Sequence, residues 1–364
     1  MRTADLTIHD VAFGGKGVAR DSGKAVFVPF TIDGERITAR IIREKKQFAE
    51  AELTKVIEPS PHRVTAPCPY FGHCGGCSYQ HIDYAHQLDL KQKQVEQAMR
   101  RIARITEPPM RPIVPSPLPY AYRNRITVHV EDGVIGFFRR DVHELMDIVE
   151  CPIAMAEVNS ALVQLRETKP ADGHYSLRAH SGPRVFAQTN DAVADAMADF
   201  IASIVTGEEE LLIDAFCGAG FFTKRLAPQF QRAIGIDWDR FAIDAARKDA
   251  RPNETYIAGD VEVELCRVMA DVSPADTESQ RVRTPATTLI VDPPAVGLTA
   301  EMRRAILDSP PHAMIYVSCN PPTVARDLAE LQSRFSVVSI TPFDMFPQTA
   351  EIEVVVHLRA TQPS

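Results

Sequence analysis

Residues 212–220, LIDAFCGAG, decide the fold of the C-terminal half of this chain. An apolar run ends at Phe216 and leads into a glycine turn, after which a helix is expected to begin at Phe221. A strand, a glycine turn and a helix open the nucleotide-binding unit of doubly wound folds, because glycine lets a ligand approach the backbone closely. The stretch therefore predicts an α/β fold with a ligand crevice at this turn.

The sequence around this stretch repeats the same alternation of strand and helix from about residue 171 onward. Amphipathic helical runs at 191–205, 240–250 and 321–331 separate apolar strand-like runs. The expected strands are 185–189, 211–216, 233–237, 255–258, 288–292, 313–318, 335–341 and 352–358. Apolar strands separated by helices indicate a mainly parallel sheet covered on both faces. Residues 271–286 look like a long polar surface loop.

The first 170 residues have a different pattern. Short β-rich runs separated by turn residues over 1–58 predict a small barrel, and the prolines at 59–61 mark a boundary. A cysteine cluster, a helical stretch over 84–105, a proline-rich connector over 108–119 and a short hairpin follow. We therefore expect three domains, at 1–58, 59–170 and 171–364.

Composition limits the class of protein. The 364 residues include 40 Lys and Arg against 48 Asp and Glu, a net charge of −8, and 45% are hydrophobic, which excludes a disordered or fibrous chain. No apolar run reaches the roughly 18 residues of a membrane span, and the N-terminus has no apolar signal stretch. We therefore expect a cytoplasmic protein, without a membrane partner and monomeric.

The net acidic charge does not settle whether the chain binds nucleic acid, because binding depends on where the charges lie. Residues 88–140 hold ten Lys and Arg against five Asp and Glu. This stretch predicts a phosphate-contacting surface in the central domain. The alternative is a solvated helix face followed by an arginine-bearing hairpin.

Two acidic residues end the strands that follow the glycine turn. Asp237 and Asp260 are placed where carboxylates can bind the ribose hydroxyls and the adenine amino group of a nucleotide. The third glycine of a dinucleotide fingerprint is absent, with Phe222 instead, and this favours S-adenosylmethionine over NAD. Helix N-capping is the alternative role for both carboxylates.

The candidate reactive groups also follow strands. Asp292 and Cys319 come after apolar runs, so both are expected to face the same crevice. A helix is expected to begin just after Cys319, and its positive end would stabilise a thiolate; a spare buried cysteine is the alternative. Glu351 and Glu353 precede the last strand, and either is a candidate general base or a surface acid.

Four of the seven cysteines suggest a metal site. Cys68, Cys74 and Cys77 have the spacing C-x5-C-x2-C, and Cys151 lies far downstream. Structural zinc sites usually pair two C-x2-C knuckles. An iron–sulfur cluster therefore fits this pattern better than zinc or free thiols.

Several stretches together resemble a known family. DAFCGAGFFT, IVDPPAVG, VSCNPP and FPQTAEIE are similar to the motifs of RNA uracil-5-methyltransferases, which are class I S-adenosylmethionine enzymes. GGKGVAR with VFVPFTIDGERITARI resembles a TRAM domain, an OB-like RNA-binding barrel. CPYFGHCGGCSYQHIDYAHQLDLKQ resembles the family's 4Fe–4S segment, and FAQTN its cofactor-clamping strand. The resemblance implies a Rossmann-like, mainly parallel seven-stranded sheet, an N-terminal OB-like β-barrel and a small central α+β domain whose cluster takes Cys151 as fourth ligand.

The resemblance also implies a mechanism and a partner. Cys319 would add to C6 of uracil so that C5 can accept a methyl group, Glu353 would remove the C5 proton, and Asp292 would hold the uracil or the cofactor. The implied cofactor contacts are Gln188, Phe216, Gly218, Gly220, Asp237, Asp260 and Asp292. The partner would be structured RNA, with 23S rRNA favoured over tRNA.

Three positions depart from the family pattern. Phe221 stands where Asn is usual, Ala295 where Arg is usual, and Glu351 where His is usual. Two alternatives follow. One is an exocyclic-amine methyltransferase without a covalent step, and the other is an RNA-binding iron–sulfur protein that has lost catalysis.

Overall fold

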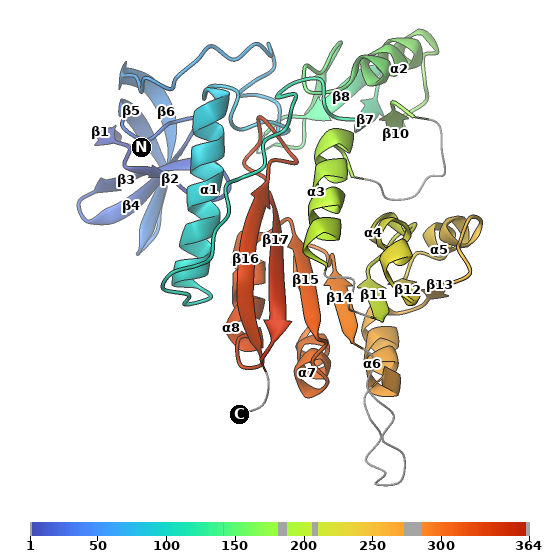
Figure 1. The fold of residues 1–364 in the computed structure, drawn as a ribbon. Helices are drawn as coiled ribbons and strands as arrows, with labels where there is room; N and C mark the ends of the chain where they lie inside the picture. Colours follow the sequence, from blue (N-terminus) through green and yellow to red (C-terminus); the bar gives the residue numbers. More distant parts are fainter. Residues whose placement is uncertain (1, 141, 181–187, 206–209, 273–285, 362–364) are drawn as a thin grey trace, which may run out of the picture.

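The structure is a computed structural model that describes residues 2–140, 142–180, 188–205, 210–272 and 286–361. Three β-sheets follow one another along the chain (Figure 1). Part of the strand predicted at 185–189 and most of the loop predicted at 271–286 lie outside the described residues.

The N-terminal sheet is barrel-like, as the β-rich runs predict. Its six strands are ordered β1-β5-β6-β4-β3-β2, and every pairing is antiparallel except that of β4 with β6. Alternate side chains, among them Val26, Ile37 and Ala39, point into one buried core. The strands are β1 Thr3–Thr7, β2 Asp10–Val11, β3 Lys16–Asp21, β4 Lys24–Pro29, β5 Arg36–Glu44 and β6 Phe48–Glu58.

The central region contains helix α1 and a four-stranded antiparallel sheet in the order β10-β7-β8-β9. The Asp83 side chain caps α1 by accepting a hydrogen bond from His86 N at 3.0 Å. Strand β10 lies beyond the boundary expected at 171 and pairs with β7, so the central sheet extends past that position. The elements are α1 Tyr84–Arg101, β7 Arg125–Glu131, β8 Val134–Phe138, β9 Leu145–Asp147, α2 Ala156–Glu167 and β10 Gly173–Arg178.

The C-terminal half confirms the class I fold, with a seven-stranded sheet in the order β13-β12-β11-β14-β15-β17-β16. The first five strands are parallel, and β17 runs antiparallel to both of its neighbours. The five residues of β11 are all buried, as expected for a central parallel strand covered on both faces. The strands are β11 Leu211–Ala215, β12 Arg232–Asp237, β13 Glu254–Ala258, β14 Thr287–Val291, β15 Ala313–Ser318, β16 Phe335–Phe343 and β17 Glu353–Ala360.

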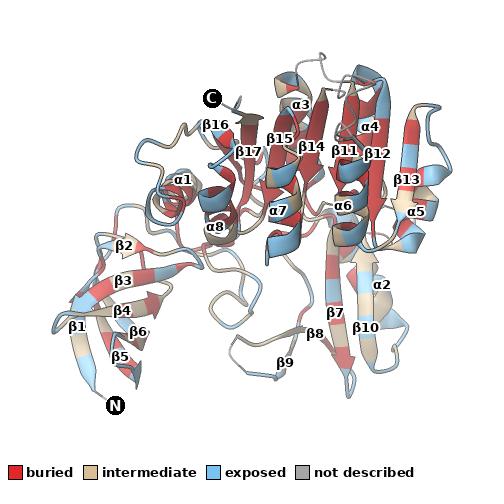
Figure 2. Ribbon diagram, turned by 90° about the horizontal axis from the view of Figure 1, so that it is seen from below, coloured by how far each residue is buried: buried red, intermediate tan, exposed pale blue. Residues whose placement is uncertain are grey.

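Helices cover both faces of this sheet, and burial is concentrated in the strands and the inner helix faces (Figure 2). Helices α3 and α4 pack on one face, and α6, α7 and α8 pack on the other. Helix α1 also packs on the second face, beside α8 and β16, so it belongs spatially to this half (Figure 1). The helices are α3 Asp191–Ile204, α4 Phe221–Leu226, η1 Ala227–Gln229, α5 Arg240–Arg247, α6 Val261–Val272, α7 Ala300–Asp308 and α8 Pro321–Leu331.

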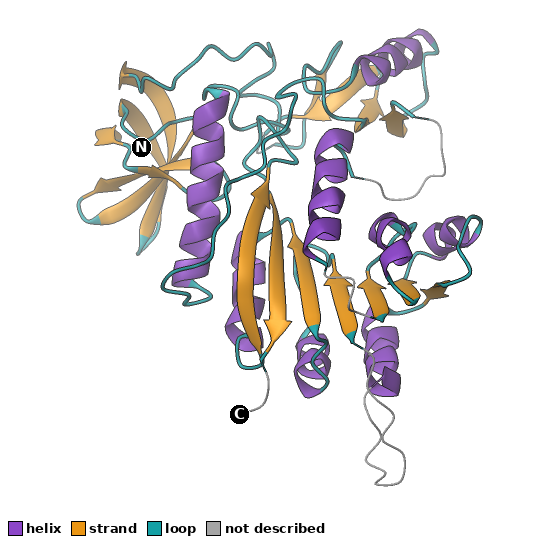
Figure 3. Cartoon of the chain, viewed as in Figure 1, coloured by secondary structure: helices purple, strands orange, loops and turns teal. Residues whose placement is uncertain are grey.

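The topology brings the candidate site to one edge of the seven-stranded sheet. The parallel strands all end at the edge that faces the central sheet, where connecting loops gather (Figure 3). The proline-rich connector runs extended along β16, with bridges from Met110 to Ile340 and from Val114 to Phe343. None of the helices in the described ranges combines the length and apolar character that a membrane crossing requires.

Candidate active site and a cysteine-lined cavity

The glycine turn after β11 has the backbone geometry of a ligand cradle. Gly218 and Gly220 are left-handed, with φ of 53° and 84°, and a Cβ on Gly220 would lie 2.7 Å from the Tyr256 hydroxyl. Phe216 also has a positive φ, 69°, which is strained for an aromatic residue and typical of functional turns. A Cβ on Gly218 would meet nothing within 4 Å, so the backbone there is open to a ligand.

Asp237 is tied to this turn. Its two carboxylate oxygens accept hydrogen bonds from Gly218 N and Asp239 N, both at 2.8 Å. The helix cap of α5 is Asp239, so capping does not explain Asp237. Each oxygen of the Asp237 carboxylate can accept a further hydrogen bond. The two hydroxyls of a ribose could donate these bonds, so the Asp237 carboxylate fits a nucleoside.

Asp260 follows β13 and caps the start of helix α6, the alternative role that the sequence suggests. Its side chain accepts a hydrogen bond from Val263 N at 3.1 Å at the start of α6. Gln188 contributes its backbone carbonyl to the Asn124 side chain at 2.8 Å. Their contact with a cofactor stays a prediction for both residues.

Sequence reasoning missed Asp214, a carboxylate buried inside β11. It accepts hydrogen bonds from the Thr223 N–H at 2.9 Å and the Thr223 hydroxyl at 2.6 Å, which fixes α4 on the strand. Burial raises the pKa of Asp214 to about 7. The signal was present in the sequence, as an acidic residue in an otherwise apolar strand.

Cys319 lies between β15 and α8, and its environment disfavours the thiolate. Burial, followed by the charges of Glu353 and Asp292, raises the pKa of the thiol to about 11. Burial and these carboxylates thus oppose the stabilisation that the start of α8 is expected to give the thiolate. The α8 N-terminus, capped by Asn320, is outweighed by burial and the two carboxylates.

The carboxylates near Cys319 affect each other as well. Burial, followed by the charge of Asp214, raises the pKa of Asp292 to about 7. Burial, then Asp292 and Glu351, raises the pKa of Glu353 well above its ordinary value. Glu353 is only 4% exposed at the start of β17, whereas Glu351 is exposed. Glu353 is thus the carboxylate buried beside Cys319, and this position favours it over the exposed Glu351 as the base.

The structure shows the surroundings of two of the three residues that depart from the family pattern, Phe221 and Ala295. Phe221 packs edge-on against Phe222, with ring centroids 5.0 Å apart, and lies under the Arg225 guanidinium. Ala295 is exposed in the loop that follows Asp292.

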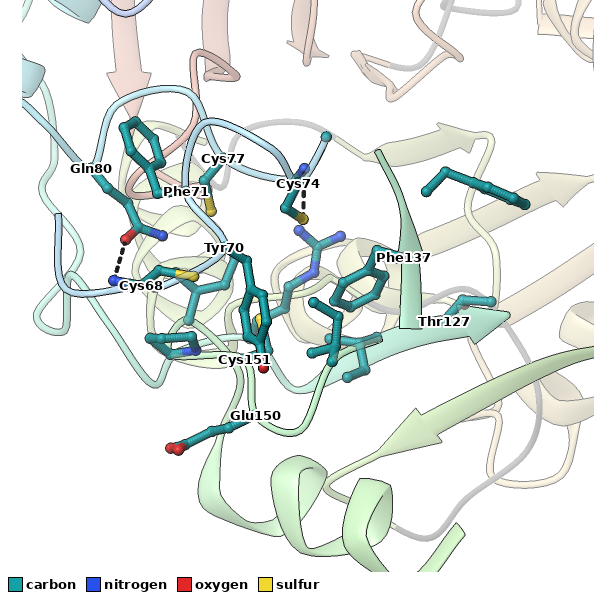
Figure 4. Close-up of a pocket in the computed structure, with 18 of the residues that line it drawn as sticks. Cys68, Tyr70, Phe71, Cys74, Cys77, Gln80, Thr127, Phe137, Glu150 and Cys151 are labelled. Carbon is teal, nitrogen blue, oxygen red and sulfur yellow. Dashed lines mark hydrogen bonds between the residues drawn. The ribbon is translucent and has the colours of Figure 1, made fainter. Parts of the chain in front are cut away.

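The four cysteines predicted as ligands come together around one cavity of about 430 Å³ (Figure 4). Cys68, Cys74 and Cys77 reach it from one loop, and Cys151 reaches it from the segment after β9. Burial is the main cause that raises the pKa of Cys77 to about 12 and of Cys151 to about 11. Arg123 and other polar residues also line this cavity.

The cavity fits a group larger than one ion. Within the ranges that the structure describes, no three His, Cys, Asp or Glu side chains are arranged to hold a single metal ion. The volume exceeds ten times the roughly 30 Å³ share of one water molecule, and a metal group bound there would have to displace the thiol protons, because the thiolate is the metal-binding form. The donor set of four cysteines suits an iron–sulfur cluster.

Not all of the Lys and Arg residues in the basic stretch 88–140 are free to contact phosphate at the surface. Lys91 is fully buried and paired with Asp344, so the prediction that it belongs to a phosphate-contacting surface is wrong. Lys93 pairs with Asp10 of the barrel at 2.7 Å. Arg123 lines the cysteine cavity. A phosphate-contacting role stays a prediction for the remaining arginines.

Comparisons with known proteins agree with this geometry. A family model described as tRNA (uracil-5-)-methyltransferase matches residues 164–361, and a TRAM domain model matches residues 2–54. An uncharacterized RNA methyltransferase of Halalkalibacterium halodurans is 30% identical, and the match covers 96% of this chain and 95% of that protein. One of Bdellovibrio bacteriovorus is also 30% identical, with 97% and 94% covered.

A solved structure matches over nearly the whole chain. It is the Pyrococcus abyssi tRNA (uracil-54, C5)-methyltransferase in complex with S-adenosyl-L-homocysteine. The TM-score is 0.73 at 25% identity, and the match covers 97% of this chain and 99% of that one.

Proposed function

The chain belongs to the tRNA (uracil-5-)-methyltransferase family, and we propose that it methylates C5 of a uridine through a covalent bond between Cys319 and C6. It is an S-adenosylmethionine-dependent RNA methyltransferase. One observation supports the covalent mechanism: Ser318 pairs with Val354, and β14 with β15, so Cys319 lies beside the buried Glu353 and at the same end of the sheet as Asp292 and the glycine turn.

The cofactor side of the site is formed by Gly218, Gly220 and Asp237. The open backbone at Gly218 and the carboxylate of Asp237 would bind the nucleoside. S-adenosylmethionine, when bound, supplies the methyl group on a sulfonium centre. Phe216, Gln188, Asp260 and Asp292 remain proposed contacts.

The protein's own residues carry the remaining chemistry. Uracil C5 is a weak nucleophile, so the Cys319 Sγ first bonds to C6 and the electron pair of the C5–C6 double bond shifts toward C5. The thiol proton passes to Asp292, whose pKa of about 7 suits a proton acceptor near neutral pH. C5 then takes the methyl group.

Release of the product requires removal of the proton on C5. The Glu353 carboxylate takes that proton, the C5–C6 double bond re-forms, and Cys319 leaves as the thiolate. Burial favours this role, because a carboxylate whose pKa is raised is a stronger base. Because its raised pKa keeps Cys319 protonated near neutral pH, the attack on C6 depends on the proton acceptor Asp292.

The RNA must present an unstacked uridine to reach a site at the sheet edge. We place ribosomal RNA first on the resemblance of the barrel and the cysteine-bearing segment to those of 23S rRNA uracil-5-methyltransferases. tRNA is the second candidate, because the Pyrococcus abyssi tRNA enzyme matches this chain over its whole length.

The cysteine cavity is proposed to hold a 4Fe–4S cluster on Cys68, Cys74, Cys77 and Cys151. When bound, such a cluster cross-links the 68–77 loop to the segment that carries Cys151. Protein purified without oxygen should be brown and contain about four irons per chain. A colourless protein with one zinc would contradict this assignment.

The activity test is product analysis. Protein, labelled S-adenosylmethionine and either 23S rRNA or unmodified tRNA are incubated, and the digested nucleosides are separated by mass. Label in 5-methyluridine, lost in Cys319→Ala, is the expected result. Label in a base-amine methyl group would favour the non-covalent alternative, and label in neither RNA would contradict the proposed activity.

A further inference from the structure

The connection between β16 and β17, residues 344–352, leads directly into the base Glu353. Asp344, Gln348 and Thr349 in this connection are polar, yet none is more than 4% exposed. Buried polar groups require partners, and most of these partners come from the first third of the chain, more than 250 positions away.

The segment just after Cys77 supplies the first set of partners. The Ser78 and Tyr79 N–H groups both donate to the Gln348 carbonyl, at 3.1 and 2.9 Å. The Ser78 hydroxyl accepts a hydrogen bond from Ala350 N at 3.0 Å. The loop that carries three of the four cysteines is thereby attached to the connection three residues before Glu353.

Helix α1 supplies the second set. Gln87 is fully buried, its amide donates to the Gln348 Oε1 at 3.0 Å, and its Oε1 accepts from Gln348 N at 3.1 Å. This pairing is reciprocal, so it fixes both the side chain and the backbone of Gln348. Gln348 has φ 68°, a left-handed backbone conformation that a non-glycine residue keeps only when its surroundings impose it.

Lys91, one turn further along α1, forms a buried ion pair. Its Nζ lies 2.5 Å from the Asp344 Oδ1 and 3.0 Å from the Phe346 carbonyl, and neither side chain is exposed. Tyr84 donates to the other oxygen of Asp344 at 2.8 Å. Burial lowers the pKa of Lys91, while the charges of Asp344 and Glu351 oppose that shift.

Stability alone does not account for this cluster. A buried ion pair usually gains little over apolar residues of the same volume, but it fixes geometry because any displacement leaves a charge without a partner. Here the ion pair fixes the position of residues 344–352. This connection packs against α1 and leads directly to Glu353, the buried carboxylate at the reacting centre.

We propose that Ser78, Gln87 and Lys91 are positioning residues that hold residues 344–351 so that Glu353 can take the C5 proton. This inference rests on the proposed covalent mechanism. It assigns the cysteine-bearing loop and α1 a part in the second half of the reaction, product release, rather than in cofactor binding.

The amount of covalent protein–RNA adduct formed on ordinary RNA distinguishes a misplaced Glu353 from a general loss of folded protein. In the proposed mechanism methyl transfer uses Cys319, its proton acceptor Asp292 and the cofactor but not Glu353, whereas release needs the proton on C5 to be removed. A misplaced Glu353 therefore leaves the methylated RNA bonded to the protein. We expect Gln87→Leu and Ser78→Ala to accumulate a denaturant-stable protein–RNA species at least tenfold above wild type, as Glu353→Gln should. The matched control is Gln97→Leu on the same helix, whose side chain contacts Asp10 of the barrel at 3.2 Å.

The outcomes are distinct. Wild-type levels of adduct and turnover in Gln87→Leu and Ser78→Ala would overturn the proposal. So would a loss of adduct in proportion to a loss of S-adenosylmethionine binding, which is the signature of a structural role. If Glu353→Gln itself accumulates no adduct while wild type methylates RNA, the covalent mechanism fails, and the positioning role fails with it.

A second measurement tests the positioning directly and needs no RNA. Hydrogen exchange of the amides at 348–353 should be at least tenfold faster in Gln87→Leu than in Gln97→Leu, with exchange in β11 and β12 unchanged. Equal exchange at 348–353 in the two variants would overturn the proposal even if the activity were as proposed.

Discussion

The two sides of the active site are built in different ways. On the cofactor side, the bond between Gly218 and Asp237 spans 19 positions of the chain, and the bond between Thr223 and Asp214 spans nine. On the base side, the Lys91–Asp344 pair spans 253 positions. One side is a local strand–turn–helix unit, and the other is assembled from opposite ends of the sequence.

The two sides of the active site therefore depend on different parts of the chain. The cofactor side needs only the first strands of the seven-stranded sheet and the turn between them. The base side needs the N-terminal third to be folded and in place, because α1 and the cysteine-bearing loop hold the connection before Glu353. Damage to the N-terminal third should therefore impair proton removal before it impairs cofactor binding.

The largest expected effect comes from Glu353→Gln, which keeps the shape of the side chain and removes the base. Turnover should fall by about 10²–10⁴-fold, the usual contribution of a general base. The affinity for S-adenosylmethionine should stay within twofold of wild type, as measured by calorimetry. If affinity fell together with turnover, the two sides would not be separate in function.

Lys91→Met should be the most destabilising change on the base side. It leaves Asp344 buried without its ion-pair partner, and breaking a buried pair costs about 3–5 kcal/mol of unfolding free energy. Urea unfolding measures the effect. Lys93→Met is the matched stability control, since its exposed pair with Asp10 is worth at most about 1 kcal/mol. Equal losses in the two variants would contradict the buried-pair account.

Cys319 lies where the two sides of the active site meet, and its ionisation should depend strongly on pH. Because burial, Glu353 and Asp292 raise the pKa of this thiol to about 11, the thiolate fraction should rise about tenfold per pH unit from 7 to 10. Alkylation of the Cys319 peptide by iodoacetamide, followed by mass spectrometry, measures it.

The matched variant for that experiment is Asp292→Asn. Removing this carboxylate should move the rise in alkylation to lower pH, because one of the charges that oppose the thiolate is gone. A wild-type rate that levels off below pH 9 would show that the helix end outweighs the carboxylates after all.

The smallest effect is expected for Asp260→Asn. Asn caps helices about as well as Asp, so α6 should keep its stability within a few tenths of a kcal/mol. A loss of S-adenosylmethionine affinity in this variant would therefore report a cofactor contact. Asp237→Asn serves as the reference, where we expect about a tenfold loss from a weakened charge-assisted contact. Unchanged affinity in Asp260→Asn would leave capping as the role of Asp260.

The sequence predicted the local parts of this molecule and not the long-range ones. The order of strands and helices from residue 211 onward, the glycine turn and the placement of Asp292 and Cys319 after their strands follow from periodicity and turn residues, and the structure confirms them. Strand β10 was not predicted. The barrel and the gathering of four cysteines around one cavity follow from the resemblance as well.

Three features were out of reach for physical reasons. Lys91 reads as a surface charge, because nothing in its neighbourhood reveals a carboxylate 253 positions away. The raised pKa of Cys319 depends first on burial and then on the carboxylates of Glu353 and Asp292, which come from other parts of the chain. The packing of α1 on the seven-stranded sheet reflects tertiary contacts that its own pattern cannot identify.

If Cys319 bonds to C6 of a uridine at the edge of this sheet, that bond can be trapped. RNA carrying 5-fluorouridine should form a methylated adduct that persists, because fluorine at C5 cannot leave as a proton does. Mass spectrometry of the digested adduct should find the nucleotide on the peptide that contains Cys319, and Cys319→Ala should form none. An adduct on another residue, an adduct that survives Cys319→Ala, or methylation of ordinary RNA without any adduct on the fluorinated RNA would contradict the account.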